Sequence, residues 1–231
     1  MGESFFRSFI SNYLLTPLTD VIFPAECHIC ATGLGPDRKI ICSTCWREMP
    51  YFQHPTQALI PDRHFSDLYI LYEFRETIRL LIHLLKYNHY LTLAEYFAAE
   101  IEKRFVFSHI KSIEAIIPVP LYKSRKRERG YNQSEEIARA LSQITGIPVT
   151  EHLLSRIRPT KTQTRMTREE RQINMQNVFE CPTYIGPRHV LMIDDVITTG
   201  STIQECARAL KSAGCCQVDI LALAHPLIGE K

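Results

Sequence analysis

Short apolar runs and amphipathic segments alternate along this chain. The continuous apolar runs have the length and composition of buried strands, and they lie at residues 68–74, 115–119, 190–193 and 218–222. Apolar residues at helical spacing predict helices over residues 78–87, 90–105, 134–144 and 203–214. Residues 149–154 and 178–179 are weaker strand candidates. Because strands alternate with helices, the pattern predicts the α/β class, with a mostly parallel sheet flanked by helices.

The residues before the first strand divide into three stretches. Residues 1–23 carry apolar side chains near helical spacing and predict a helix that packs on the rest of the protein; a helix that binds a membrane surface or a partner is the alternative. Residues 24–50 hold four cysteines and form a separate small module in this interpretation. Residues 51–67 contain two prolines and several polar residues, which predicts a linker or loop at the start of the α/β domain of residues 51–231.

The composition is that of an ordinary water-soluble globular protein, since 45% of the 231 residues are hydrophobic and 23% are charged. The formal net charge of +2 is too small to indicate nucleic-acid binding, although basic residues gather at 123–129 and 156–171. No apolar run is long enough to span a bilayer, and the N-terminal stretch lacks the continuous apolar core of a signal peptide. We therefore expect a cytoplasmic protein without a transmembrane segment.

Four of the eight cysteines form two CxxC pairs separated by eleven residues, Cys27 and Cys30, then Cys42 and Cys45. Each pair can present two thiolates from one tight turn, so together they can complete a tetrahedral shell around a structural Zn²⁺. A segment this short cannot bury a core of its own, so the metal would supply most of its folding energy. An iron–sulfur cluster is the alternative, and disulfides fit least because no secretion signal precedes the cysteines.

The segment VLMIDDVITTGST, residues 190–202, places two carboxylates at the tip of a predicted buried strand, before a hydroxyl-rich turn and a helix. The N–H groups and the positive end of the helix dipole at such a turn hold a phosphate. Asp194 and Asp195 can accept hydrogen bonds from two sugar hydroxyls. An ordinary strand-to-helix connection would explain the apolar run and the glycine, but not two adjacent acids. The segment therefore predicts a sugar-phosphate site.

Two further segments are expected near that site. The strand at 115–119 runs into a basic loop, which a parallel sheet places on the same edge as the two acids. A solvated basic surface is the alternative for each lysine and arginine of that loop. Residues 156–179 are rich in basic and polar side chains and contain few apolar ones, which favours a mobile loop or a short exposed helix.

Five blocks of the sequence resemble the ComF/GntX family. They are CxxC–x₁₁–CxxC, LLIHLLKYN at 80–88, PVPLYKSRKRERGYNQ at 118–133, TKTQTRMTREERQINMQNVF at 160–179, and DDVITTGST at 194–202. The last block is also similar to the fingerprint of type I phosphoribosyltransferases. The resemblance covers nearly the whole chain and implies a zinc-binding N-terminal module followed by a type I phosphoribosyltransferase domain. The first CxxC pair reads CHIC, where the family often has a proline and a trailing glycine, but the thiolate spacing is intact.

The resemblance also implies roles for single residues. Asp194 and Asp195 would be the catalytic pair that holds the ribose hydroxyls of phosphoribosyl pyrophosphate, with Mg²⁺ bound to the pyrophosphate and the ribose. The 5′-phosphate is expected at Thr198, Thr199, Gly200, Ser201 and Thr202. The pyrophosphate is expected at Val119, Pro120, Leu121, Tyr122, Lys123 and Arg129. A flexible loop that closes over the reacting centre and excludes water would carry Lys161, Gln163, Arg165, Arg171 and Asn174.

Three functions stay open on the sequence alone. A phosphoribosyltransferase would act on an acceptor that no short motif encodes; a nucleobase, in a salvage reaction, is one alternative. A non-catalytic protein could bind phosphoribosyl pyrophosphate without turnover, because the motif reports binding rather than chemistry. The resemblance further implies a role in natural transformation, with single-stranded DNA and competence or recombination proteins as partners. Contact with DNA would involve residues 123–129 and 156–171.

Overall fold

The computed structural model describes residues 25–35, 40–57, 59–60, 63–105, 112–159, 177–182 and 186–226. The chain forms two compact units, Met1–Met49 and Pro50–Lys231. The helix predicted over residues 1–23 lies outside the described residues. None of the helices in the described ranges is long and apolar enough to cross a membrane.

The described part of the smaller unit is built around its four cysteines. An antiparallel bridge between Glu26 and Gly33 closes the turn that holds the first CxxC pair. The second pair begins helix α3 (Ser43–Arg47), and the N-cap residue of this helix is Cys42. The Cys42 sulfur accepts a hydrogen bond from the backbone N–H of Cys45 at 3.4 Å, as a cap side chain does. Both pairs therefore lie on tight, hydrogen-bonded turns.

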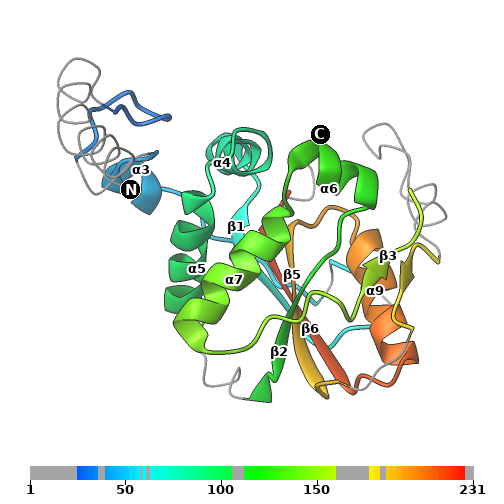
Figure 1. Cartoon of the computed structure of the whole chain (residues 1–231). Helices are drawn as coiled ribbons and strands as arrows, with labels where there is room; N and C mark the ends of the chain where they lie inside the picture. The colour runs from blue at the N-terminus through cyan, green and yellow to red at the C-terminus, as the bar shows by residue number, and fades with distance from the viewer. Residues whose placement is uncertain are drawn as a thin grey trace. The chain divides into compact units, whose positions relative to one another are not determined.

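Among the described residues, a four-stranded sheet forms the centre of the larger unit (Figure 1). Its strands are β1 (Leu68–Glu73), β2 (Ala115–Pro118), β5 (His189–Val196) and β6 (Gln217–His225). The order across the sheet is β1-β6-β5-β2, and every neighbouring pair is parallel. Parallel strands are covered on both faces, which explains why the runs in the sequence are continuously apolar rather than alternating. The predicted α/β fold with a parallel sheet is confirmed.

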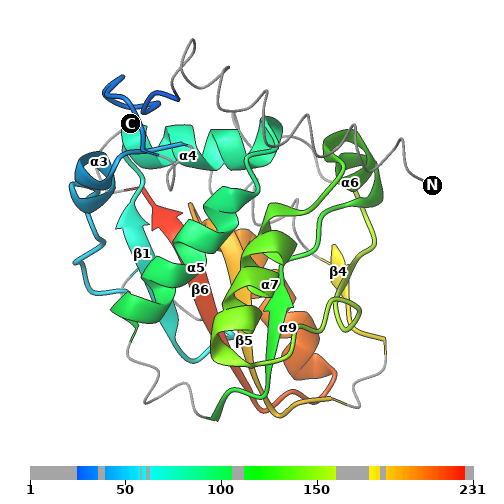
Figure 2. The same ribbon diagram turned by 60° about the vertical axis from the view of Figure 1, so that its left-hand side comes forward.

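Helices cover both faces of this sheet. Helices α5 (Thr92–Arg104) and α7 (Gln133–Thr145) pack together over one face, and α9 (Ser201–Ser212) lies against the other (Figure 2). Helices α4 (Glu76–Tyr87) and α6 (Lys123–Arg129) lie near the ends toward which the strand arrows point. In an open α/β sheet this edge is where ligands bind.

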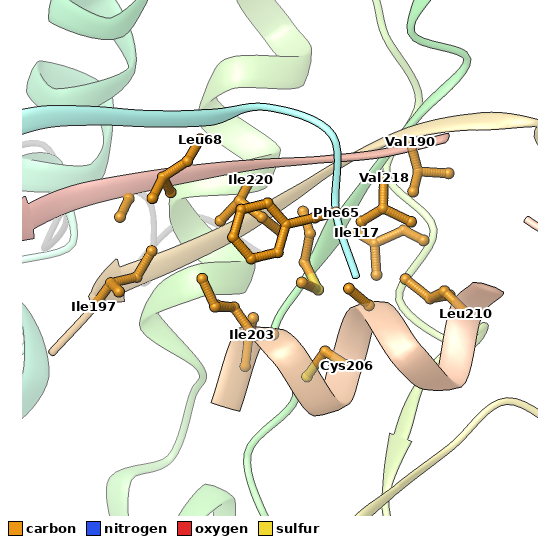
Figure 3. Packing of buried hydrophobic residues seen from close by; sticks show 14 of the residues in the cluster. Phe65, Leu68, Ile117, Val190, Ile197, Ile203, Cys206, Leu210, Val218 and Ile220 are labelled. Carbon is orange, nitrogen blue, oxygen red and sulfur yellow. The ribbon is translucent and has the colours of Figure 1, made fainter. Parts of the chain in front are cut away.

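The core between the sheet and α9 is apolar and closely packed. In Figure 3, Ile203, Cys206 and Leu210 of α9 point toward residues of the strands, and all three are buried. Phe65 also enters this cluster, together with Phe52 and Ile60. These three residues come from the stretch predicted as a linker, so this stretch contributes to the core although it forms no helix or strand in its described part.

Two local predictions were wrong. Residues 149–154 form no strand: Val149 makes only an isolated bridge to Ile116, and the short strand β3 is Ser155–Arg156, which pairs antiparallel with β4 (Phe179–Glu180). The basic loop after β2 is instead the helix α6, because lysine, arginine and glutamate favour helices and Gly130 ends the helix in the left-handed conformation.

Candidate functional site

The four cysteine sulfurs of the smaller unit form one cluster. The Sγ atoms of Cys27, Cys30, Cys42 and Cys45 all lie within 4.8 Å of one another. In a tetrahedral site with Zn–S bonds of about 2.3 Å, neighbouring sulfurs are about 3.8 Å apart. The distance between the sulfurs of Cys30 and Cys42 is 3.7 Å. The donor set and its spacing therefore fit a closed, structural zinc site.

Electrostatics of the cluster also favours a cation. Hydrogen bonding with the side chain and backbone of Thr32 lowers the pKa of the Cys30 thiol to about 6. Burial and the three neighbouring cysteines raise the pKa of Cys45. Four thiolates at this spacing repel one another, and a divalent cation among them removes the repulsion. The backbone N–H of Cys42 donates to the Cys27 sulfur at 3.3 Å, which holds the two pairs together.

The paired acids of the larger unit lie at the carboxyl end of β5. Asp195 is buried, and Asp194 is half-buried beside it. The Lys86 ammonium at the end of α4 lies 2.7 Å from an Asp195 carboxylate oxygen. Ser134, in the first turn of α7, donates its hydroxyl to Asp194 at 3.5 Å. Two helices that are distant in sequence therefore hold the polar end of this strand.

Packing two carboxylates side by side changes their titration. Burial and the charge of Asp195 raise the pKa of Asp194 to about 7, although Lys86 acts in the opposite direction. The charge of this site therefore depends on the ionisation of Asp194. A bound cation or a set of hydroxyl donors would favour the ionised form of this carboxyl group.

The segment Gly130–Gln133 ties the walls of this site together. The Tyr131 hydroxyl donates to the backbone carbonyl of Leu85 in α4. The fully buried Asn132 caps α7 and donates its amide to the carbonyl of Val119 at 2.9 Å. Arg129 donates to the side-chain oxygen of Gln133. Because these bonds reach α4, α6 and the residues after β2, the segment fixes where their side chains meet.

A cavity of about 270 Å³ opens beside the acids. Side chains from five other elements and from the loop after β2 line it together with the end of β5: Lys86, Tyr87, Val119, Pro120, Leu121, Arg125, Arg129, Gln133, Arg156, Asp194, Asp195, Val196 and Thr202. Four of these residues are cations and two are carboxylates, so the cavity suits a ligand with several negative charges. Burial lowers the pKa of the Arg156 guanidinium, and the charge of Arg125 acts in the same direction.

The turn between β5 and α9 requires a glycine at the start of the helix. Gly200 is the N-cap residue of α9 and has a φ of +77°. A Cβ there would lie 2.3 Å from Cδ1 of Ile60, so only glycine fits without movement. Because glycine has no side chain to cap the helix, the first-turn N–H groups remain available to an anion. The hydroxyls of Thr199 and Ser201 are hydrogen-bonded to each other at 2.9 Å.

The site residues expected from the sequence fall into three groups. The first group lines the cavity: Val119, Pro120, Leu121, Arg129, Asp194, Asp195 and Thr202. The second group is described but does not line it: Tyr122, Lys123, Thr198, Thr199, Gly200 and Ser201. The third group, expected on a flexible loop, lies outside the described residues: Lys161, Gln163, Arg165, Arg171 and Asn174.

Several polar residues of the site were not predicted from the sequence, among them Gln133, which lines the cavity. Lys86, Arg125 and Arg156 line the cavity, and Ser134 contacts Asp194. The signal for Lys86 was its position as the single basic residue in the last turn of α4, a helix with a strongly apolar face. Arg125 and Arg156 lie within runs of basic residues, where nothing local distinguishes a lining side chain from a solvated one.

Two family models match this chain. A phosphoribosyl transferase domain model matches residues 94–231, and a double zinc ribbon domain model matches residues 18–56. The chain is 32% identical over 214 residues to competence protein F of Haemophilus influenzae, covering 86% of this chain and 93% of that protein.

Two further relatives are more distant. The DNA utilization protein YhgH of Salmonella typhimurium is 26% identical over 223 residues, with 88% of this chain and 98% of that protein covered. Competence protein ComFC of Bacillus subtilis is 23% identical, with 81% and 78% covered. The parallel sheet, the cysteine cluster and these matches lead to one conclusion: the chain belongs to the competence protein F/ComFC family, with an N-terminal zinc ribbon and a phosphoribosyl transferase domain.

Proposed function

We propose that this protein binds phosphoribosyl pyrophosphate with Mg²⁺ in the cavity at the end of β5. The observation that carries the proposal is the joint placement of two carboxylates and four cations in one cavity beside the start of α9. A polyanionic sugar needs both kinds of group: cations for its phosphates and hydrogen-bond acceptors for its hydroxyls.

Each part of the ligand has a matching part of the cavity or of the turn beside it. Asp194 and Asp195 would accept hydrogen bonds from the ribose 2′ and 3′ hydroxyls. The turn of residues 198–202 would hold the 5′-phosphate at the start of α9, where backbone N–H groups and the helix dipole favour an anion. The pyrophosphate would lie against residues 119–121, with Arg129 as a cationic partner.

The same residues suit a phosphoribosyl transfer. Departure of pyrophosphate leaves positive charge on the ribose, and the adjacent carboxylates stabilise that charge. Oxygen atoms are the ligands that Mg²⁺ prefers, so the pyrophosphate and the ribose hydroxyls would hold the ion, with the two carboxylates accepting hydrogen bonds from the same hydroxyls. When bound, Mg²⁺ would supply positive charge to the leaving pyrophosphate. The ion pair with Lys86 would hold the Asp195 carboxylate in position.

Calorimetric titration with phosphoribosyl pyrophosphate and Mg²⁺ tests the proposal. Wild type is expected to bind, and the Asp194→Asn/Asp195→Asn variant is expected to lose at least tenfold in affinity. The matched control is Glu95→Gln/Glu102→Gln, which removes the same charge from two exposed acids of α5 and should bind as wild type does. Absence of binding by wild type, or equal binding by the Asp194/Asp195 variant, would contradict the proposal.

The names of the relatives and the surface of α6 support a second role, in the handling of single-stranded DNA. None of the side chains of α6 is buried, and the helix carries five basic residues. Lys126 is paired with Glu135 at 2.8 Å, whereas Arg127 is exposed and makes no ion pair with the other described residues. Exposed cations on one short helix suit the phosphates of a flexible strand.

The salt dependence of DNA binding, compared between two variants of equal net charge, distinguishes a contact with α6 from an unspecific effect of net charge. Fluorescence anisotropy with a labelled single-stranded oligonucleotide is expected to show weaker binding and a shallower salt slope for Arg127→Glu. Losing one phosphate contact lowers the slope by roughly 0.7. Arg79→Glu is the control, because Arg79 is also exposed but lies on α4. If both variants lose affinity equally, α6 has no specific role.

A further inference from the structure

A second cavity lies directly beside the first. It measures about 260 Å³ and shares Lys86, Tyr87, Arg125 and Arg129 with the cavity at the end of β5. Two residues line only the second cavity, His89 and Glu128. We call this second cavity the side cavity. Because the two cavities share four residues, a ligand in the side cavity would lie next to a sugar bound by the two acids.

The shared wall of the side cavity carries an aromatic stack. Tyr87 is 58% exposed, the largest exposed fraction among the bulky apolar side chains that the structure describes. The Arg129 guanidinium lies over its ring, 5.0 Å from the ring centroid. A guanidinium plane over an aromatic ring presents a flat surface on which a third planar group can stack. The wall therefore suits a planar ring rather than an aliphatic chain.

His89 holds an unfavourable backbone conformation at this cavity. It follows Asn88, the C-cap residue of α4, and has a φ of +59°. Glycine is the usual residue at that position after a helix, because a side chain there is strained. The imidazole ring lies 5.3 Å from the ring of Tyr131 and lines the side cavity. Strain of this kind clusters at ligand-binding positions.

The charges of the side cavity select against a neutral ring. Three cations and one carboxylate line it. Lys86 is already paired with Asp195, but Arg125 makes no ion pair with any other residue in the described ranges. An anionic group attached to the ring would satisfy Arg125 while the ring stacks on Arg129 and Tyr87.

We propose that the side cavity is the acceptor site and binds a planar heteroaromatic ring that carries an anionic group. The same chemistry occurs in a free heteroaromatic carboxylate and in a nucleotide of a single strand. The role of the ring as an acceptor rests on the proposed phosphoribosyl function, whereas binding of the ring does not depend on that function.

Equilibrium dialysis with three probes tests the proposal, both without and with saturating phosphoribosyl pyrophosphate and Mg²⁺. Orotate is the ring with a carboxylate, uracil is the same ring without it, and a ten-residue oligodeoxythymidylate offers rings with phosphates. Wild type is expected to bind orotate at least tenfold more tightly than uracil. If the oligonucleotide binds and competes with orotate, the natural source of the ring is a nucleic acid; if only orotate binds, the source is a small molecule.

Three variants test the residues that would bind the ring; of the two positions, Tyr87 lines both cavities and His89 lines the side cavity alone. Tyr87→Leu should lower orotate affinity about tenfold, because loss of one stacking partner has that size of effect, whereas Tyr87→Phe should retain it. His89→Gly should also weaken binding and yet raise the urea midpoint, since glycine relieves the strain. Circular dichroism and zinc content verify folding of each variant. The proposal is overturned if wild type binds neither orotate nor oligonucleotide, or if Tyr87→Leu binds as wild type does.

The two proposals fail in distinguishable ways. If wild type does not bind phosphoribosyl pyrophosphate but binds orotate in a Tyr87-dependent way, the proposed function is contradicted and the ring site is supported. Binding of phosphoribosyl pyrophosphate without binding of orotate or the oligonucleotide would contradict the proposed ring site and would support the proposed function.

Discussion

At the residue scale, the chemistry of the site depends on how Asp194 and Asp195 share one small volume. Burial and the charge of Asp195 raise the pKa of Asp194, and the positive charge of Lys86, which pairs with Asp195, limits that rise. The ligand-free protein thus holds a carboxyl whose ionisation is opposed by its surroundings. A bound cation or a pair of sugar hydroxyls would relieve this opposition, which couples ligand binding to the charge of the pair.

Replacing Asp194 by asparagine should stabilise the ligand-free protein in a pH-dependent way. The pKa of Asp194 is about 7 in the folded state against an ordinary value of 3.8, so the folded protein binds the extra proton between these values. Wild-type stability is therefore reduced as pH rises through this window, and the variant escapes that reduction. Urea unfolding should show a gain for Asp194→Asn that is larger at pH 8 than at pH 5.

The control for that experiment is Glu102→Gln, an exposed acid on α5. Its effect on the free energy of unfolding should be small and the same at both pH values. A gain for Asp194→Asn that is equal at pH 5 and pH 8 would show that burial and the charge of Asp195 do not oppose ionisation of Asp194 in the folded protein.

Ala31 is a second residue where local geometry makes a prediction. It follows the first CxxC pair and has a φ of +57°, a conformation that costs an alanine about 1 kcal/mol or more. Its N–H donates to the carbonyl of Cys27 at 2.9 Å, so the turn cannot relax without losing this bond. Ala31→Gly should therefore stabilise the zinc-bound unit by about 1 kcal/mol. Competition with a chromogenic chelator should show tighter zinc retention, and unchanged or weaker retention would contradict the strain argument.

At the element scale, the start of α9 depends on contact with a segment far away in sequence. Gly200 needs its positive φ, and it also packs against Ile60 from the stretch before β1. Gly146, which ends α7, has a similar φ of +74°, but no atom lies within 4 Å of the position that a Cβ would take there. Gly146 is therefore required only for its backbone conformation, whereas Gly200 is required both for its backbone conformation and for its packing against Ile60.

Alanine substitutions at these glycines should differ in cost. Gly146→Ala should destabilise by about 1–2 kcal/mol, the cost of the left-handed conformation alone. Gly200→Ala should cost roughly 2–5 kcal/mol, because overlap with Ile60 adds to it. In urea unfolding, Ile60→Val should recover part of the loss in Gly200→Ala but none in Gly146→Ala. Equal costs for the two alanines would show that Ile60 moves aside freely.

At the scale of the whole molecule, two units are stabilised by different means. The larger unit has a layered apolar core on its sheet, whereas the smaller unit gathers four thiolates around one point. Small modules without a sufficient core depend on their metal.

Zinc removal should therefore unfold one unit and spare the other. Trp46 is the single tryptophan of the chain and lies in the smaller unit, so its emission reports on that unit alone. A strong chelator should shift this emission to longer wavelength, while the urea midpoint of the larger unit, followed by circular dichroism, stays within error. Cys45→Ser should lower zinc content, and Cys216→Ser, at an exposed cysteine outside the cluster, should not. A parallel loss of both signals would mean that the units unfold together.

Much of this organisation is visible in the sequence because it depends on local physics. Continuous apolar runs between turn signals favour buried strands, two CxxC pairs present four thiolates, and adjacent acids at a strand tip are not explained by packing. These features determined the parallel sheet, the cysteine cluster and the position of Asp194 and Asp195. The helix at 123–129 was missed because charged residues at the surface give no hydrophobic period, although their propensity favours a helix.

Only the tertiary structure decided which distant side chains meet. Lys86 reaches Asp195 because α4 ends at the carboxyl edge of β5, and Arg156 reaches the cavity through the pairing of β3 with β4. The side cavity exists because Tyr131 and Asn132 bind α4 and the residues after β2 to one another. No periodicity or spacing encodes such contacts, since they depend on the packing of elements rather than on the order of residues within one element.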